Sequence, residues 1–186
     1  VHHSLNTLFD VYSFDIASIL GRSHKDKIRK TPIWRLGNED FLIHLCSHIY
    51  WHTCSIRDIV DGNDAKLLSY SDIRHFVKSH LLDWNNLFAY ARDGNLGIPL
   101  KYVLYHCELI YGDVIPKDIF NGFDKLELVK MSNEIHDRWL TRDANIVIGH
   151  WQKGFMERLF DANRHMMALQ SMYSEYIEPI LRRGAY

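Results

Sequence analysis

The segment HLCSHIYWHTC, residues 44–54, carries the histidines His44, His48 and His52 at intervals of four, together with two cysteines. Histidines spaced in this way lie on one side of an α-helix, where a pair could share a metal ion. Zinc sites need a third and usually a fourth ligand, and the H-E-x-x-H arrangement also uses its glutamate as a base. No glutamate stands between His44 and His48, and helical rotation of about 100° per residue turns Cys46 away from both. We therefore expect the three imidazoles to line a pocket or the edge of a helix–helix contact. A role as metal ligands or in catalysis is disfavoured.

Arg57 and Asp61 follow four residues apart, one helical turn from each other. Such a pair on a helix surface forms a salt bridge that stabilises it by only about 0.3 kcal/mol. The alternative is a buried polar network that joins Arg57 to His48 or His52. The spacing alone leaves both roles open for Arg57, and it nominates no catalytic and no metal-binding residue.

The elements that hold these residues are predicted to be helical almost without interruption after Leu36. We expect Asn38 to cap a helix that runs to about His52, with acidic residues in its first turn. A second helical stretch over 56–68 should break near Gly62. Ser71 and Asp83 are the expected caps of the two helices that follow, and a further helix should contain Pro99 in its first turn and end at Gly112.

The last third of the sequence is predicted to contain a short helix at residues 117–120 and two longer helices, at 125–140 and about 148–173. Pro179 should kink or end the last of these helices, and residues 181–186 are expected to fray. Before Leu36 the pattern is mixed. It predicts strands at 1–6 and 32–36, a helix at 14–20 and a solvated basic loop at 21–30. The predicted fold class is mainly α, a helical bundle over 37–186 preceded by a small α+β part over 1–36.

Composition and charge exclude several classes of function. Of 186 residues, 22 are Lys or Arg and 23 are Asp or Glu, so no global field attracts nucleic acid or anionic lipid, and any such binding must be local. Three cysteines match no disulfide framework, and no run approaches the roughly 18 apolar residues of a membrane span. We expect a cytoplasmic protein that binds no membrane, with nucleic acid disfavoured as a partner. The start VHHSLN, without an initiator Met, leads us to expect the C-terminal part of a longer protein.

Two ordered segments, residues 36–61 and 81–116, resemble the C-terminal half of uncharacterised bacterial nucleotidyltransferase-like proteins of the polymerase-beta superfamily. That family has a Leu-x-x-Glu-Asp opening, two histidines four apart, a Leu-Arg-x-x-x-Asp segment, an Asp-Trp helix start and a Val-Pro-like turn. The matching residues here are Leu36, Glu39 and Asp40; His48 and His52; Ile56, Arg57 and Asp61; Asp83 and Trp84; and Ile115 and Pro116. The set agrees in order and spacing, whereas His44 has no counterpart.

The resemblance implies that residues 1–36 are the end of a nucleotidyltransferase sheet, with VHHSLN as one of its strands. It also implies Mg²⁺ and an NTP for the full-length protein, held by a Gly-Ser turn and an Asp-x-Asp pair. Neither motif is found in this chain. We therefore expect the helical part of an enzyme that transfers a nucleotidyl group to an unknown acceptor, with no cofactor bound and no catalysis by this chain alone. The resemblance implies that this part shapes the acceptor side of a substrate cleft, and the candidates to face that cleft are His48, His52, Arg57 and Asp61. The alternative is a stand-alone helical module that binds a ligand or a protein. The oligomeric state is left open.

Overall fold

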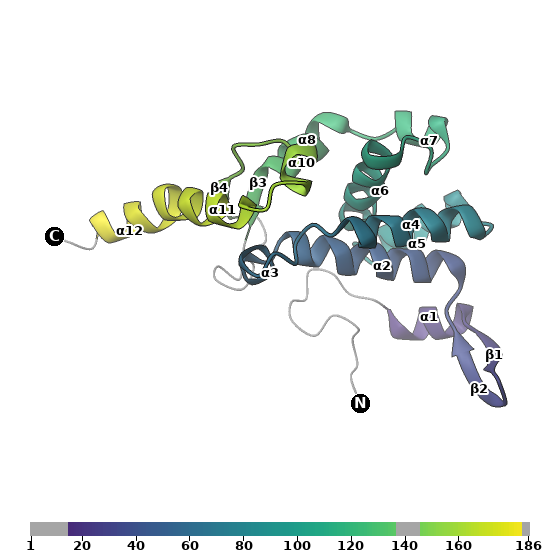
Figure 1. Cartoon of the computed structure of the whole chain (residues 1–186). Helices are drawn as coiled ribbons and strands as arrows, with labels where there is room; N and C mark the ends of the chain where they lie inside the picture. Colours follow the sequence, from purple (N-terminus) through teal and green to yellow (C-terminus); the bar gives the residue numbers. More distant parts are fainter. Residues whose placement is uncertain (1–14, 137–145, 184–186) are drawn as a thin grey trace.

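The computed structural model describes residues 15–136 and 146–183, and most of them are helical (Figure 1). Helix α2 (Asn38–Thr53) packs against α6 (Gly97–Tyr111), α5 (Trp84–Asp93) and α4 (Leu67–Ser79). These four helices enclose the main hydrophobic core, which confirms the predicted bundle. Its fully buried side chains include Leu42, Cys46, Tyr70, Ile73, Leu87, Leu100, Val103 and Leu104.

Helix α6 is buried on most of its surface, because apolar residues occupy nearly every position of its sequence. Pro99 lies in its first turn, where its missing N–H needs no partner. Gly112 ends it in the left-handed conformation at φ 73°, a backbone region that glycine enters without a steric penalty. Both predicted ends of this central helix are confirmed.

Two of the predicted caps are wrong. The cap of α2 is Gly37, because the Asn38 side chain instead donates a hydrogen bond to the Leu81 carbonyl, at 3.1 Å. Helix α4 begins at Leu67, with Lys66 at its N-cap position, so Ser71 lies inside the helix. The expected cap Asp83 is confirmed, because its carboxylate accepts from the Asn86 N–H at 3.0 Å.

The N-terminal part consists of α1 (Ile16–Arg22) and a hairpin of β1 (His24–Ile28) and β2 (Thr31–Arg35). Helix α1, capped by Asp15, agrees with the predicted helix, and β2 with the predicted strand at 32–36. The basic segment expected as a loop instead supplies β1. Its residues are exposed on both faces, so no hydrophobic alternation marked it as a strand. The predicted strand at 1–6 lies outside the described residues.

Helix α7 (Lys117–Asn121) confirms the short helix predicted at 117–120. After it, the observed secondary structure differs from the prediction. Helix α8 (Lys125–Asn133) stops early and leads into β3 (Glu134–His136), which pairs antiparallel with β4 (Val147–His150). The two longer helices at 125–140 and 148–173 were therefore wrong. The reason is a second, smaller core, in which side chains from both strands are buried against α3 and α11. Its members are Ile59, Ile135, Ile148, Trp151 and Ala168.

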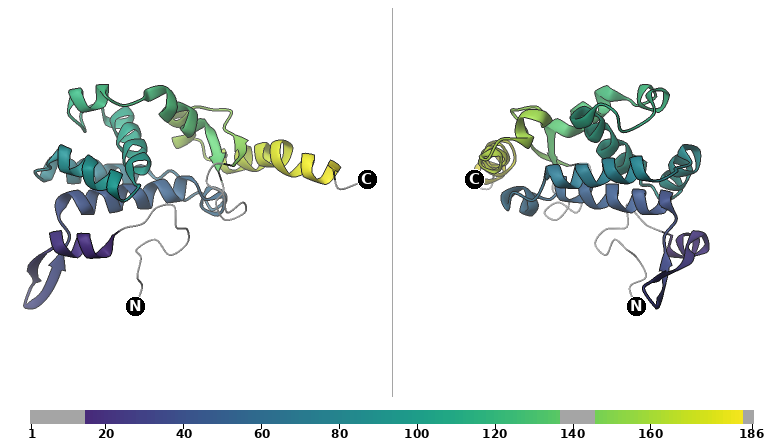
Figure 2. Two further views of the ribbon diagram at one scale, coloured as in Figure 1. Left: turned by 180° about the vertical axis from the view of Figure 1, so that it is seen from behind. Right: turned by 45° about the vertical axis from the view of Figure 1, so that its right-hand side comes forward.

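The C-terminal end contains α10 (Phe155–Leu159), α11 (Arg164–Met172), the π-helical segment η1 (Tyr173–Ile177) and α12 (Glu178–Arg183). The helix widens in η1 directly before Pro179, a common way for a helix to pass an irregular position. In Figure 2, α12 and the β1–β2 hairpin project at opposite ends of the molecule. Within the described ranges, no helix is long and apolar enough to cross a membrane.

Candidate functional site

The histidines of α2 lie along its polar flank, beside the side that packs into the core. The His48 and His52 rings meet edge to face, with their centroids 4.5 Å apart and their Nε2 atoms separated by 3.2 Å. His44 lies farther away, at 6.5 Å from His48 between ring centroids. Cys46 is fully buried on the opposite side of the helix, as its position around the axis predicted. The histidine stripe therefore contains one close imidazole pair.

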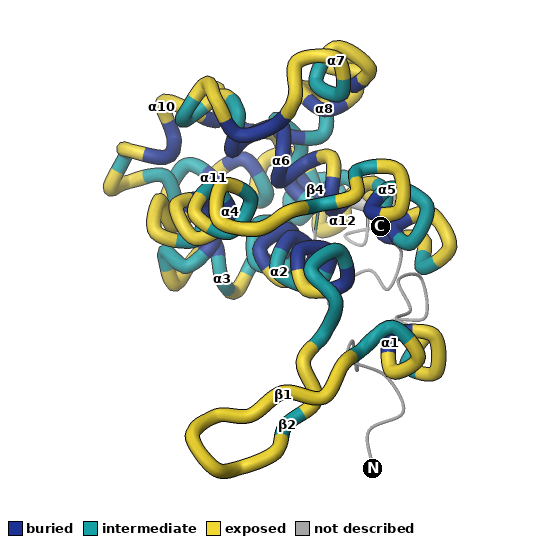
Figure 3. Tube along the Cα trace, turned by 90° about the vertical axis from the view of Figure 1, so that its right-hand side faces the viewer, coloured by how far each residue is buried: buried dark blue, intermediate teal, exposed yellow. Residues whose placement is uncertain are grey.

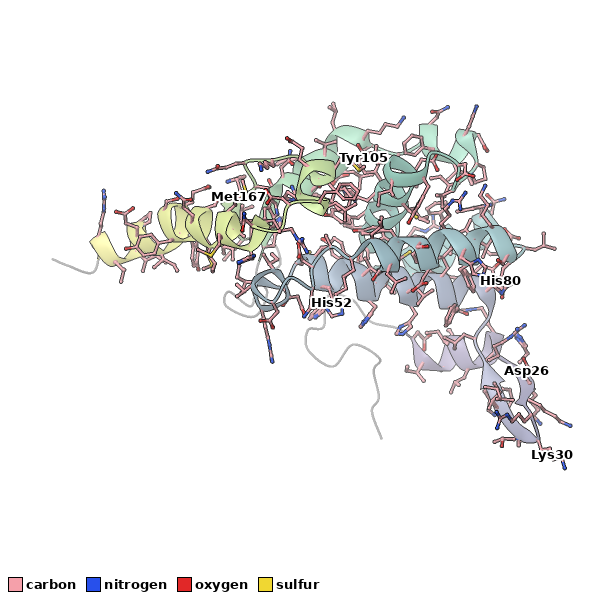
Figure 4. The ribbon with its side chains drawn as sticks, in the orientation of Figure 1. Asp26, Lys30, His52, His80, Tyr105 and Met167 are labelled. Carbon is pink, nitrogen blue, oxygen red and sulfur yellow. The ribbon has the colours of Figure 1, made fainter. Side chains whose placement is uncertain are left out.

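Asp58 extends this pair into a row of three polar side chains. Its Oδ1 lies 3.1 Å from His52 Nδ1, within ion-pairing distance but out of line for a hydrogen bond. Asp58 belongs to the short helix α3 (Ile56–Val60), which the Ser55 side chain caps by accepting from the Asp58 N–H at 3.3 Å. The contact at His52 is therefore electrostatic, and the cap fixes where the carboxylate stands. Figure 4 shows His52 near the end of α2, next to α3.

These side chains border a polar hollow of about 270 Å³ between α2, α3 and the start of α4. Its lining contains two imidazoles, two carboxylates, an ammonium, an amide and a hydroxyl. Such groups can hydrogen-bond a polar ligand in several orientations. The lining residues are His48, Ile49, His52, Asp58, Asn63, Asp64, Lys66 and Ser69.

The floor of the hollow is held by an ion pair from the other end of the chain. Asp64 is buried, and its Oδ1 lies 3.0 Å from Nε of Arg164 in α11. Arg164 also donates to the Gly62 carbonyl at 3.2 Å, so it secures the turn between α3 and α4. The partly buried Arg164 side chain thus connects the hollow with α11, which also contributes to the smaller core.

Burial lowers the pKa of the His48 imidazole below its ordinary value, and the nearby His52 and His44 rings lower it further. Asp58 acts in the opposite direction, but its effect is smaller. Burial also lowers the pKa of His44. His48 is therefore neutral at pH 7, with one ring nitrogen carrying a proton and the other able to accept a hydrogen bond.

Arg57 and Asp61 do not reach the hollow. Their side chains are 88% and 54% exposed, and they form a surface ion pair with 3.9 Å between Arg57 Nε and Asp61 Oδ2. Helix α3 is a little over one turn long, and the chain reverses after it at Gly62, φ 70°. That reversal leaves Asp58, not Asp61, facing the histidines. The spacing of Ser55 and Asp58, a cap followed by an acid three residues later, is the signal that could have indicated Asp58.

The carboxylates of the hollow are already paired with cations or imidazoles. Asp64 is bound by Arg164, and Asp58 faces His52. Within residues 15–136 and 146–183, no group of three or more His, Cys, Asp or Glu side chains is arranged to hold a metal ion. The hollow therefore fits a polar organic ligand better than Mg²⁺, which prefers several free oxygen ligands.

A second hollow, of about 400 Å³, lies between α5, α6 and α8. Phe88, Ile98 and Met131 give it an apolar wall, and two cations and two carboxylates stand at its border. One of those carboxylates, Asp124, is occupied as the cap of α8. The charged border residues are Arg92, Lys101, Asp124 and Glu127.

Comparison with known proteins gives one match. A family model described as "Uncharacterised nucleotidyltransferase" matches residues 1–112. No curated protein and no solved structure matches the chain. The matched range ends at the C-cap of α6 and contains every residue that lines the polar hollow of His48 and His52.

Proposed function

The chain belongs to the uncharacterised nucleotidyltransferase family, and from this premise we propose that it forms the acceptor side of a nucleotidyl-transfer site. In the proposed reaction, the enzyme transfers a nucleotidyl group from an NTP to an acceptor. The observation that carries the proposal is the polar hollow beside the His48–His52 pair, which lies wholly inside the matched range.

The chemistry of the hollow suits an acceptor that carries hydroxyl groups. A neutral imidazole such as His48 accepts a hydrogen bond from a hydroxyl, and the Asp58 carboxylate stands 3.1 Å from Nδ1 of His52. Lys66 adds a positive charge at the edge of the hollow, where it would attract a phosphorylated acceptor or the transferred phosphoryl group. In this account His48 and His52 bind and orient the acceptor, while Arg57 and Asp61 lie outside the site.

In the proposed reaction, the NTP and Mg²⁺ are not bound in the polar hollow. An Asp-x-Asp pair, the arrangement that holds the two ions in this superfamily, does not occur in the sequence, and the described carboxylates of the hollow do not fit a metal. In the proposal, Mg²⁺ and the NTP would be held by a Gly-Ser turn and an Asp-x-Asp pair in the protein as its gene encodes it, and this chain alone would not catalyse.

Transfer of label from an α-³²P-labelled NTP tests the proposal. We expect the full-length gene product to transfer the label to an acceptor in a fraction of cell extract. The 186-residue chain should transfer no label. The double variant His48→Ala/His52→Ala should lose at least about tenfold of the labelling, the loss expected when hydrogen bonds that hold a substrate are removed. Arg57→Ala is the control, because Arg57 lies on the neighbouring helix α3 outside the hollow, and it should retain full labelling. Labelling by the 186-residue chain itself would contradict the proposal.

A ligand-binding module without catalysis is the second candidate function. The observation that favours it is the larger hollow between α5, α6 and α8, whose apolar wall and charged border are typical of small-molecule pockets. Binding of a metabolite-sized compound there, abolished by Lys101→Glu, together with no label transfer by any form of the protein, would favour this function over the first.

A further inference from the structure

The β1–β2 hairpin projects from the helical body and contributes almost nothing to the core. All of β1 and all of β2 except Ile33 are exposed, which Figure 3 shows as an almost continuous exposed stretch. Among the described strands, none from outside the hairpin pairs with it. An isolated two-stranded hairpin is marginally stable, so its residues are not explained by folding alone.

The hairpin is the most basic short segment of the described chain. Between residues 24 and 35 the sequence has five Lys or Arg side chains and one acidic side chain, Asp26, although the whole chain has a net charge of -1. Lys30 lies at the tip, at the far end from the helical body (Figure 4). A cationic projection on an otherwise balanced surface concentrates positive potential at one place.

The register divides these charges between two faces. Cross-strand partners share a face, so Lys25 lies beside Trp34, and Lys27 lies beside Pro32. No acidic side chain occupies this face, and the Lys25 ammonium stands 5.5 Å from the centre of the Trp34 ring. Trp34 is 61% exposed, which is unusual for the residue with the largest apolar side chain.

The opposite face is largely neutralised by its own contacts. Arg35 Nε lies 3.7 Å from Asp26 Oδ2 and donates to His24 Nε2 at 2.8 Å. The two faces therefore differ in chemistry, one with unpaired lysines around an aromatic ring and one with a paired arginine. We define the Trp34 face as Lys25, Lys27, Pro32 and Trp34.

The hairpin turn contains a cation, Arg29, at a position where glycine would cause less backbone strain. Arg29 has φ 58°, a left-handed conformation at the first central position of a two-residue hairpin loop, which commonly belongs to glycine. Placing an arginine there costs about 1 kcal/mol of backbone strain. A charged residue at a strained turn position is a candidate for a role outside the hairpin.

We propose that the Trp34 face and the hairpin turn form a binding surface for single-stranded nucleic acid. Phosphates of the strand contact Lys25, Lys27 and the turn cations, and one base stacks on the exposed indole of Trp34. The alternation of flexible cations with an exposed aromatic ring suits a flexible strand, whose bases are open to stacking. A duplex hides those faces, and an acidic protein offers no repeated planar group. This inference stands on the hairpin alone and does not depend on the transferase proposal.

Fluorescence anisotropy with a labelled single-stranded 20-mer RNA tests the inference. We expect binding by the 186-residue chain at 50 mM salt, with a log–log salt slope of about −2 to −3, because each contacted phosphate of a single strand contributes about −0.7. Lys25→Glu/Lys27→Glu should raise the Kd by at least about tenfold and reduce the slope. The matched control, Lys117→Glu/Lys125→Glu, makes the same charge change on α7 and α8 and should leave the Kd within about twofold.

Substitution of the aromatic ring separates stacking from simple charge attraction. Trp34→Ala should raise the Kd by about fivefold or more, and Trp34→Phe should restore most of the affinity. Because the hairpin lies outside the core, all of these variants should keep the far-ultraviolet circular dichroism spectrum and the melting temperature. Four results would overturn the inference: no binding, an equal loss in the control variant, an unchanged Kd in Trp34→Ala, or tighter binding to a duplex of the same sequence.

Discussion

The guanidinium of Arg164, which is 13% exposed, and the buried carboxylate of Asp64 form an ion pair, 3.0 Å from Nε to Oδ1, across 100 residues of sequence. The contact connects α11 to the turn before α4, because Arg164 also binds the Gly62 carbonyl. It therefore links the C-terminal helices to the polar hollow, whose lining includes Asp64.

Removal of Arg164 should destabilise the protein strongly. Arg164→Ala leaves the Asp64 carboxylate buried without a partner, which typically costs about 3–5 kcal/mol of unfolding free energy. Urea denaturation followed by circular dichroism measures the change. Arg57→Ala, which breaks the exposed pair with Asp61, should change the unfolding free energy by less than about 0.5 kcal/mol. Equal effects of the two substitutions would contradict the structural role of Arg164.

Stability should fall in acid because of His106. Burial lowers its pKa to about 3, and its ring is paired on both sides: Nδ1 lies 2.8 Å from the Tyr102 carbonyl, and Nε2 lies 3.0 Å from Ser132 Oγ. A carbonyl can only accept, so Nδ1 carries the proton, and the neutral Nε2 accepts from Ser132.

The unfolded state binds this proton at an ordinary pKa near 6.5. The contribution of His106 to the unfolding free energy is therefore fully present above pH 6.5 and is lost as pH falls toward 3. Each pH unit in this range removes up to about 1.4 kcal/mol. We expect urea denaturation to give a clearly smaller unfolding free energy at pH 4.5 than at pH 7.5. His106→Gln should be less stable at pH 7.5 but should lose less on acidification, and an unchanged pH dependence in this variant would refute the assignment.

The titration midpoint of His48 should depend on the side chains of His52 and Asp58. Burial is the main cause of its lowered pKa, and the His52 ring contributes as a nearby positive charge when protonated. His52→Ala should therefore raise the midpoint of His48, and Asp58→Asn should lower it, because Asp58 favours the protonated form. Nuclear magnetic resonance of the imidazole nitrogens measures both midpoints. A His48 midpoint that moves in the same direction in both variants would show that the three side chains do not interact as described.

Gly149 should tolerate no larger side chain. A Cβ at this position of β4 would lie 2.9 Å from Ser171 Oγ and 3.0 Å from the Met172 backbone nitrogen, so β4 and α11 would have to separate. Gly149→Ala should lower the unfolding free energy by about 1–3 kcal/mol. Gly21→Ala is the control, because nothing lies within 4 Å of its Cβ and alanine favours helix α1. Its melting temperature should stay equal or rise.

Local signals explain which parts of the fold could be predicted. The ends of α6 follow from Pro99 and Gly112, whose backbone preferences act within one turn. The strands β3 and β4 could not be found in this way, because their pairing joins segments more than ten residues apart, and it is their burial against α11 that favours strands over helices. Propensity is a weak guide where tertiary contacts decide.

The candidate site shows the same division. The spacing of His48 and His52 predicted that they lie on one side of a helix, which is a local property, and the family resemblance nominated them for a cleft. Asp58 and Asp64 were not, because their direction depends on the reversal at Gly62 and on Arg164 from a distant helix.

The central claim is that the hollow beside His48 and His52 binds the acceptor of a nucleotidyl transfer. Its most direct test is steady-state kinetics of the full-length gene product, as wild type and as His48→Gln. The acceptor is first isolated by its label, and the concentrations of acceptor and NTP are then varied. We predict a KM for the acceptor raised by about tenfold, with the KM for the NTP unchanged, because the variant alters only groups that contact the acceptor. A raised KM for the NTP with an unchanged KM for the acceptor would contradict the claim.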